Sequence, residues 1–121
     1  MREFYFERLR VWQNAKEFTK DIYLLTAHFP DDEKFGITSQ IRRATLSICA
    51  NIAEGSARNT PKDRAKFINQ SFSSAIEVLN FLILIKDLEL INTDQYSSFR
   101  EKIEKITNQL NALSKKIKEE F

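Results

Sequence analysis

The segment from Gln40 to Gly55, QIRRATLSICANIAEG, constrains the fold of this chain more than any other feature. If this segment is a helix, its polar residues lie three or four positions apart and form one narrow stripe: Gln40, Arg43, Ser47, Asn51 and Glu54. Most other positions are apolar or small. Such a helix must be covered on several sides, so we expect it at the centre of a core or in a subunit interface.

Length and composition favour one helical domain that spans residues 1–121. A chain of 121 residues is long enough for a single core, and its ten Phe supply bulky core material. With only two Gly and two Pro, it offers few of the tight turns that an all-β fold requires. The composition therefore predicts an all-α fold.

The sequence predicts a cytoplasmic protein that does not enter a membrane. The single cysteine, Cys49, cannot form an intramolecular disulfide, and the first residues lack the apolar core of a secretory signal. The longest apolar run, Val78 to Ile85, is far shorter than the roughly 20 residues that span a bilayer.

Apolar periodicity predicts four helices with short connections. The first is expected from about Glu7 to His28, and the second from a Thr38 or Ser39 cap to near Gly55. The third is expected to begin at a Thr60 cap and reach about Glu89, and the fourth to follow an Asn92 or Thr93 cap. Because the third helix is apolar on two sides, we predict that it is the most buried.

Four long helices with short connections favour an antiparallel up-down four-helix bundle. The second and third helices carry apolar residues around most of their circumference, and a four-helix monomer can cover only part of that surface. We therefore predict a homo-oligomer in which these two helices contribute contacts.

A turn near residue 60 would place residues of the second and third helices opposite each other where their numbers sum to about 120. The polar stripe then meets a second one and forms a seam, with the predicted pairs Gln40–Asn80, Arg43–Glu77, Ser47–Ser73, Asn51–Asn69 and Glu54–Lys66. The alternative interpretation is that each stripe is simply the solvated face of its helix.

Residues that could support catalysis are few, and the sequence predicts no enzyme, no metal site and no cofactor. His28 is the only histidine, so one chain cannot build a two-histidine metal site. Cys49 lies among apolar residues, which is typical of a small buried hydrophobe. Glu54 and Glu77 could act as paired carboxylates, although an ion pair or solvation explains them as well.

The distribution of charge is more informative than the net charge of +2. In an up-down bundle, the chain start, the turn near residue 60 and the chain end meet at one pole, where ten cationic residues stand against six acidic ones. The candidate nucleic-acid-binding residues at this pole are Arg8, Arg10, Arg58, Lys62, Arg64, Lys66, Lys115 and Lys116. The alternative is an ordinary dipolar surface without a ligand, since the opposite pole is acidic.

The chain resembles the 23S ribosomal RNA intervening-sequence protein family. The resemblance covers nearly the whole chain, and the residues that carry it are Leu9-Arg10-Val11-Trp12-Gln13-Asn14-Ala15, Phe29-Pro30, Gln40-Ile41-Arg42-Arg43-Ala44, Ser47-Ile48, Asn51-Ile52-Ala53-Glu54-Gly55, Phe67, Ser74 and Glu77. It implies a four-helix bundle that assembles as a ring-shaped homopentamer. It implies no demonstrated activity.

The chain is also similar, more distantly, to the accessory variability protein of diversity-generating retroelements, a pentameric bundle that binds nucleic acid and a reverse transcriptase. These resemblances and the basic pole together favour a non-enzymatic oligomer that binds RNA or DNA. A scaffold that docks a protein partner is the second hypothesis. An enzyme or ligand-binding protein that uses carboxylates between subunits is the third.

Overall fold

The computed structural model describes residues 1–121 and contains helices but no strands. The four long helices are α1 (Arg10–Thr26), α2 (Ile37–Ser56), α3 (Pro61–Asp87) and α4 (Thr93–Lys118). Two single-turn 3-10 helices, η1 (Tyr5–Arg8) and η2 (Asp31–Glu33), precede α1 and α2. The prediction of an all-α chain with four helices is confirmed.

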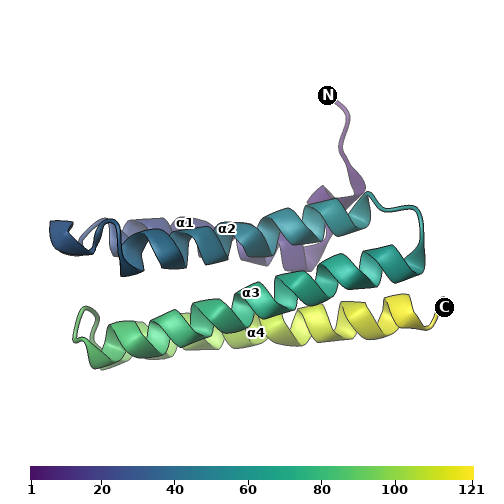
Figure 1. Ribbon diagram of the computed structural model, residues 1–121. Helices are drawn as coiled ribbons and strands as arrows, with labels where there is room; N and C mark the ends of the chain where they lie inside the picture. The colour runs from purple at the N-terminus through teal and green to yellow at the C-terminus, as the bar shows by residue number, and fades with distance from the viewer.

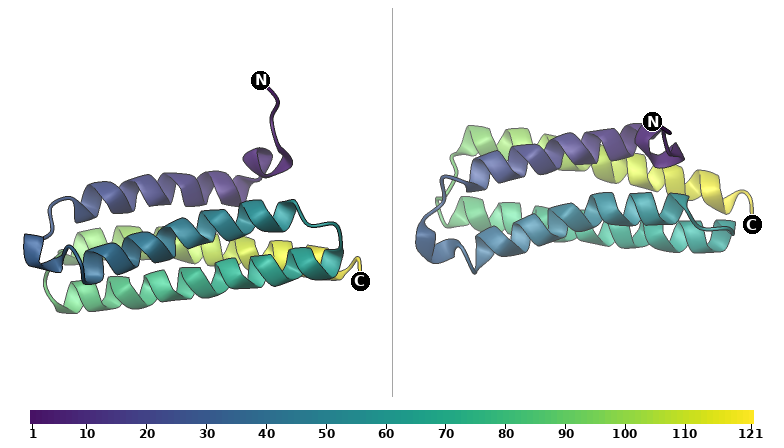
Figure 2. Two further views of the ribbon diagram at one scale, coloured as in Figure 1. Left: turned by 45° about the horizontal axis from the view of Figure 1, so that its top comes forward. Right: turned by 90° about the horizontal axis from the view of Figure 1, so that it is seen from above.

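The four long helices lie side by side (Figures 1 and 2). The α1–α2 and α3–α4 connections lie at one end of the bundle, and the α2–α3 connection lies with both termini at the other. Each helix packs against the next one along the chain, and α1 also packs against α4. The chain start, residues 57–60 and the chain end therefore share one end of the molecule.

The first helix begins later and ends earlier than predicted. Leu9 has an extended backbone (φ −70°, ψ 125°), which separates η1 from α1. The η1 turn is stabilised locally, because the backbone N–H of Phe4 donates to Glu7 Oε2 over 2.7 Å and the Phe6 ring meets the Trp12 ring edge to face at 5.0 Å. These contacts keep residues 5–8 out of the axis of α1, so the predicted start at Glu7 is wrong.

Helix capping was predicted correctly for α3 and α4 but not for α2. The Thr60 hydroxyl accepts from the Asp63 N–H, and the side chains of Asn92 and Gln95 form a reciprocal capping box. The cap of α2 is instead Gly36, without a side-chain hydrogen bond. Thr38 and Ser39 lie inside the helix, where Thr38 is buried.

A cluster of 20 buried apolar residues forms the core, and all of them come from the four long helices except Ile91, which lies in the α3–α4 connection. The prediction that α3 is the most buried helix is wrong, since α2 buries seven of its 20 residues and α3 seven of its 27. The inner stripe of α3 includes Ile68, Ala75 and Leu82, whereas Ile76 and Ile83 are exposed. Apolar side chains thus remain uncovered on the outer face of α3.

By length and composition alone, α3 is the one helix that could cross a membrane, with a mean hydropathy of 1.4 over 18 residues. The core helix of a water-soluble bundle passes the same test. Here α3 packs along its length against α2 and α4 and buries its inner stripe between them.

Candidate nucleic-acid interface

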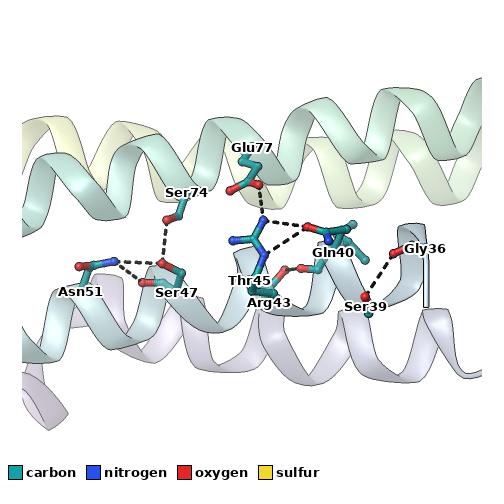
Figure 3. Close-up of polar contacts among 10 residues, drawn as sticks. Gly36, Ser39, Gln40, Arg43, Thr45, Ser47, Asn51, Ser74 and Glu77 are labelled. Carbon is teal, nitrogen blue, oxygen red and sulfur yellow. Dashed lines mark hydrogen bonds and ion pairs between the residues drawn. The ribbon is translucent and has the colours of Figure 1, made fainter. Parts of the chain in front are cut away.

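The contact between α2 and α3 centres on Arg43 and Glu77 (Figure 3). The Arg43 guanidinium donates through Nη2 to Glu77 Oε2 in an ion pair. It also donates to Gln40 Oε1, over 3.2 Å from Nε and 3.1 Å from Nη2. No hydrogen bond joins Gln40 to its predicted partner Asn80, and Gln40 Oε1 accepts instead from Arg43, one turn further along its own helix.

Serine hydroxyls continue the contact toward the α2–α3 connection. The Ser74 hydroxyl donates to Ser47 Oγ over 2.9 Å, and Asn51 Nδ2 donates to Ser47 Oγ over 3.0 Å (Figure 3). The predicted partner of Ser47 was Ser73, so the prediction is wrong by one residue. Successive helical residues are about 100° apart, so Ser74 faces α2 while Ser73 faces solvent.

The remaining predicted seam pairs are not formed. Asn69 Oδ1 accepts from Ser114 of α4 over 3.5 Å and not from Asn51. Glu54 and Lys66 are both exposed and no hydrogen bond or ion pair joins them. The seam is also partly open to water, because the side chains of Arg43 and Glu77 are 54% and 37% exposed.

A shallow polar trough runs along the outer side of the first half of α3, and we call it the α3 trough. It has a volume of about 700 Å³ and is open to solvent. Its lining residues come from α2, α3 and the end of α4: Ser47, Asn51, Lys62, Ala65, Lys66, Asn69, Gln70, Ser73, Ser74, Lys118 and Phe121. Three lysines contribute positive charge, and no Asp or Glu lines the trough.

The eight predicted nucleic-acid-binding residues have different surroundings in the structure. Lys62 and Lys66 line the α3 trough together with Lys118, a trough residue that the candidate set omitted. Its position in the last turn of α4, close to the chain end, was the available signal. Arg58 instead lies over the Phe67 ring, with Cζ 4.4 Å from the ring centroid.

Arg64 has contacts within the chain that occupy its guanidinium. Its Nη1 donates to the carbonyl oxygen of Arg58 over 3.2 Å, and its Nη2 lies 3.5 Å from Glu120 Oε1. The side chain is only 26% exposed. Arg64 therefore holds the end of α4 against the α2–α3 connection, a structural role that leaves little of it for a ligand.

The other four cations lie outside the α3 trough. Arg8 Nε is 3.7 Å from Glu3 Oε1, and Arg10 is exposed at the first position of α1. Lys115 and Lys116 are exposed in the last turn of α4, where positive charge opposes the negative end of the helix dipole. Lys116 borders a smaller, more apolar hollow beneath η1.

The candidate catalytic residues lie apart from one another. Burial raises the pKa of the Cys49 thiol, and its 3.6 Å contact with Thr19 Oγ1 opposes that rise only in part. A nucleophilic cysteine needs the opposite shift, since the thiolate is the reactive form. His28 is exposed in the turn after α1, and no three His, Cys, Asp or Glu side chains gather closely enough to hold a metal ion.

Comparisons with known proteins agree with this architecture and indicate no enzyme family. A crystal structure of a protein of unknown function from the S23 ribosomal protein family of Bacteroides thetaiotaomicron is similar, with a TM-score of 0.81 and 28% identity over 87% of this chain and 95% of that one. No curated protein matches the chain. The family model of the 23S rRNA-intervening sequence protein matches residues 7–112. The chain therefore belongs to the 23S rRNA-intervening sequence protein family.

Proposed function

We propose that this protein is a non-enzymatic nucleic-acid-binding protein that works as a homo-oligomer of antiparallel up-down bundles. The observation that carries the proposal is the α3 trough, which Lys62, Lys66 and Lys118 line without an Asp or Glu side chain. A phosphate backbone releases condensed counterions when such cations replace them, which favours binding irrespective of sequence. The net charge of +2 is small, so this local arrangement supplies the attraction.

The exposed apolar side chains support self-association. Leu46 of α2 and Ile76, Ile83 and Leu84 of α3 are between 38% and 48% exposed. Contact with a second copy would remove these side chains from water, at about 25 cal/mol per Å² of apolar surface buried. Copies that associate side by side would also bring their basic ends together and strengthen the attraction for a polyanion.

The test is the affinity of the purified protein for mixed RNA and DNA oligonucleotides, measured by fluorescence anisotropy at several salt concentrations. We expect log Kd to change linearly with log salt. The double variant Lys62→Glu/Lys66→Glu should weaken binding by at least about ten-fold, because it reverses two charges of the α3 trough.

The matched control is Lys34→Glu/Lys86→Glu, which makes the same change in net charge at the opposite end of the bundle. It should weaken binding by less than about three-fold. Equal loss in both double variants would show that only the net charge matters. Absence of binding at low salt would refute the proposed function.

A second candidate function is a scaffold that docks a protein partner, and the same exposed apolar side chains of α2 and α3 favour it. A partner held there would be captured independently of salt, in contrast to a polyanion at the basic end. Substitution of Ile76 with Asp would abolish that capture, because it places a carboxylate in the apolar contact.

A further inference from the structure

We propose that the α3 trough binds a single strand of RNA or DNA in preference to a duplex. The inference rests on the proposed function and specifies its ligand. Two parts of the trough differ in chemistry. At the end near the chain termini, Lys62, Lys66 and Lys118 present ammonium groups, whereas Gln70 and Ser73, further along α3, are exposed and uncharged.

The uncharged part of the trough is equipped to bind groups other than phosphate. No hydrogen bond within the chain engages the Gln70 amide or the Ser73 hydroxyl, so both remain available to a ligand. Amides and hydroxyls can donate to and accept from base edges and sugar hydroxyls. A strand whose phosphates lie against the lysines would place its next nucleotides beside these groups.

A duplex fits this surface less well than a strand. Base edges of a duplex lie inside its grooves, and reading them requires an element that projects into a groove. The α3 trough is a hollow lined by residues of α2, α3 and the end of α4, and a hollow supplies no such projecting element. Bases of a single strand can turn toward the protein, and they can stack on an aromatic face. The exposed Phe121 ring, at the cationic end, is such a face.

The dimensions of the trough agree with a short stretch of strand. From Lys62 to Ser74 the axis of α3 rises by about 18 Å, at 1.5 Å per residue. That length matches about five nucleotides of a stacked strand at 3.4 Å each. It lies within the range of about 4 to 16 nucleotides that single-strand-binding folds occupy.

The experiment compares single strands of uridine or thymidine, about 12 nucleotides long, with a duplex of equal length. Strands and duplex are all longer than the expected site, so each can fill it. Anisotropy titrations at several salt concentrations give affinities and salt slopes. We expect both strands to bind at least about ten-fold more tightly than the duplex. The triple variant Lys62→Glu/Lys66→Glu/Lys118→Glu should lose at least about ten-fold in strand affinity, with the salt slope lowered by about 2.

The control triple variant, Arg10→Glu/Lys115→Glu/Lys116→Glu, carries the same charge change at the same end of the bundle but outside the trough. It should lose less than about three-fold in strand affinity. Far-UV circular dichroism of both triple variants checks that each is folded. Equal losses would overturn the assignment to the trough while leaving the proposed function in place.

An uncharged double variant, Gln70→Ala/Ser73→Ala, tests the base-facing part without any charge reversal. It should weaken strand binding by about three- to ten-fold, with the salt slope and the duplex affinity unchanged. Duplex binding as tight as strand binding would overturn this inference alone. Failure of every oligonucleotide to bind would overturn both the inference and the proposed function.

Discussion

Both halves of α3 have a buried inner stripe, but their outer faces differ in polarity. In the first half, Ile68 and Ser71 are buried beneath a polar surface that carries Lys62, Lys66 and Gln70. In the second half, Val78 and Leu82 are buried, while Ile76 and Ile83 are exposed on the outside. The buried inner stripe therefore stabilises the bundle along the whole of α3, whereas the outer residues of each half determine what kind of ligand or partner can bind there. Glu77, bonded to Arg43, lies near the boundary.

The strongest effect should be on assembly. It should occur for substitutions on the apolar outer face of the second half of α3 and not for those on the polar outer face of the first half. The variant Ile76→Asp/Ile83→Asp should reduce the mass measured by light scattering to that of one chain, 14.2 kDa, because it places carboxylates in the apolar contact through which we propose that copies associate. The matched variant Gln70→Asp/Ser73→Asp, on the polar half of the same helix, should keep the mass of the unmodified protein. A mass of one chain for the unmodified protein at micromolar concentration would refute the proposed homo-oligomer.

The second prediction concerns the inner stripe, which should respond alike in both halves. Ile68→Ala and Leu82→Ala each leave a cavity among residues that are almost fully buried. Each should lower the free energy of unfolding by about 2 to 5 kcal/mol. Urea denaturation at one fixed protein concentration measures both, since self-association contributes to apparent stability. A cost below 1 kcal/mol at either position would contradict a shared core.

A third effect tests how closely α2 approaches the first half of α3. A Cβ added at Gly55 would lie 3.0 Å from Phe67 Cβ and 3.4 Å from the carbonyl oxygen of Arg64. Gly55→Ala should therefore cost about 1 to 3 kcal/mol by overpacking. Helix propensity alone predicts the opposite sign, a gain of up to about 1 kcal/mol. The sign measured by urea denaturation distinguishes the two explanations.

The smallest effect is expected at the boundary between the halves. The Arg43–Glu77 ion pair is 54% and 37% exposed, so water screens it and its coupling energy should be about 0.2 to 1 kcal/mol. A double-mutant cycle with Arg43→Ala and Glu77→Ala measures that energy. It should shrink further as salt is raised. A coupling above 2 kcal/mol would mean that the pair is shielded from water in the assembled protein.

Local sequence signals predicted the number of helices and the starts of α3 and α4, but not the starts of α1 and α2. Thr60-Pro61 and Asn92 marked the starts of α3 and α4, because their caps depend only on residues a few positions away. The break at Leu9 depends on contacts between Phe6 and Trp12. The turn near residue 60 also predicted the Arg43–Glu77 pair, yet Ser47 has Ser74 as its partner, one residue from the predicted Ser73.

The candidate site was predicted in part. Charge counting placed Lys62 and Lys66 at the basic end, but it could not distinguish cations that face an open surface from those occupied within the chain. Arg58 over the Phe67 ring and Arg64 beside Glu120 belong to the second kind. Such contacts join residues up to 56 positions apart, so they cannot be predicted before the packing of the helices is known.

Four helices with apolar inner stripes can be predicted from the amino-acid sequence, because helix periodicity and most caps are local properties of the chain. The α3 trough, where polar groups of α2, α3 and the end of α4 meet, and the exposure of Ile76 and Ile83 became known only from the packed structure. Both depend on the rotation of each helix about its axis, and hence on the neighbours of each side chain, which the packing of all four helices fixes together.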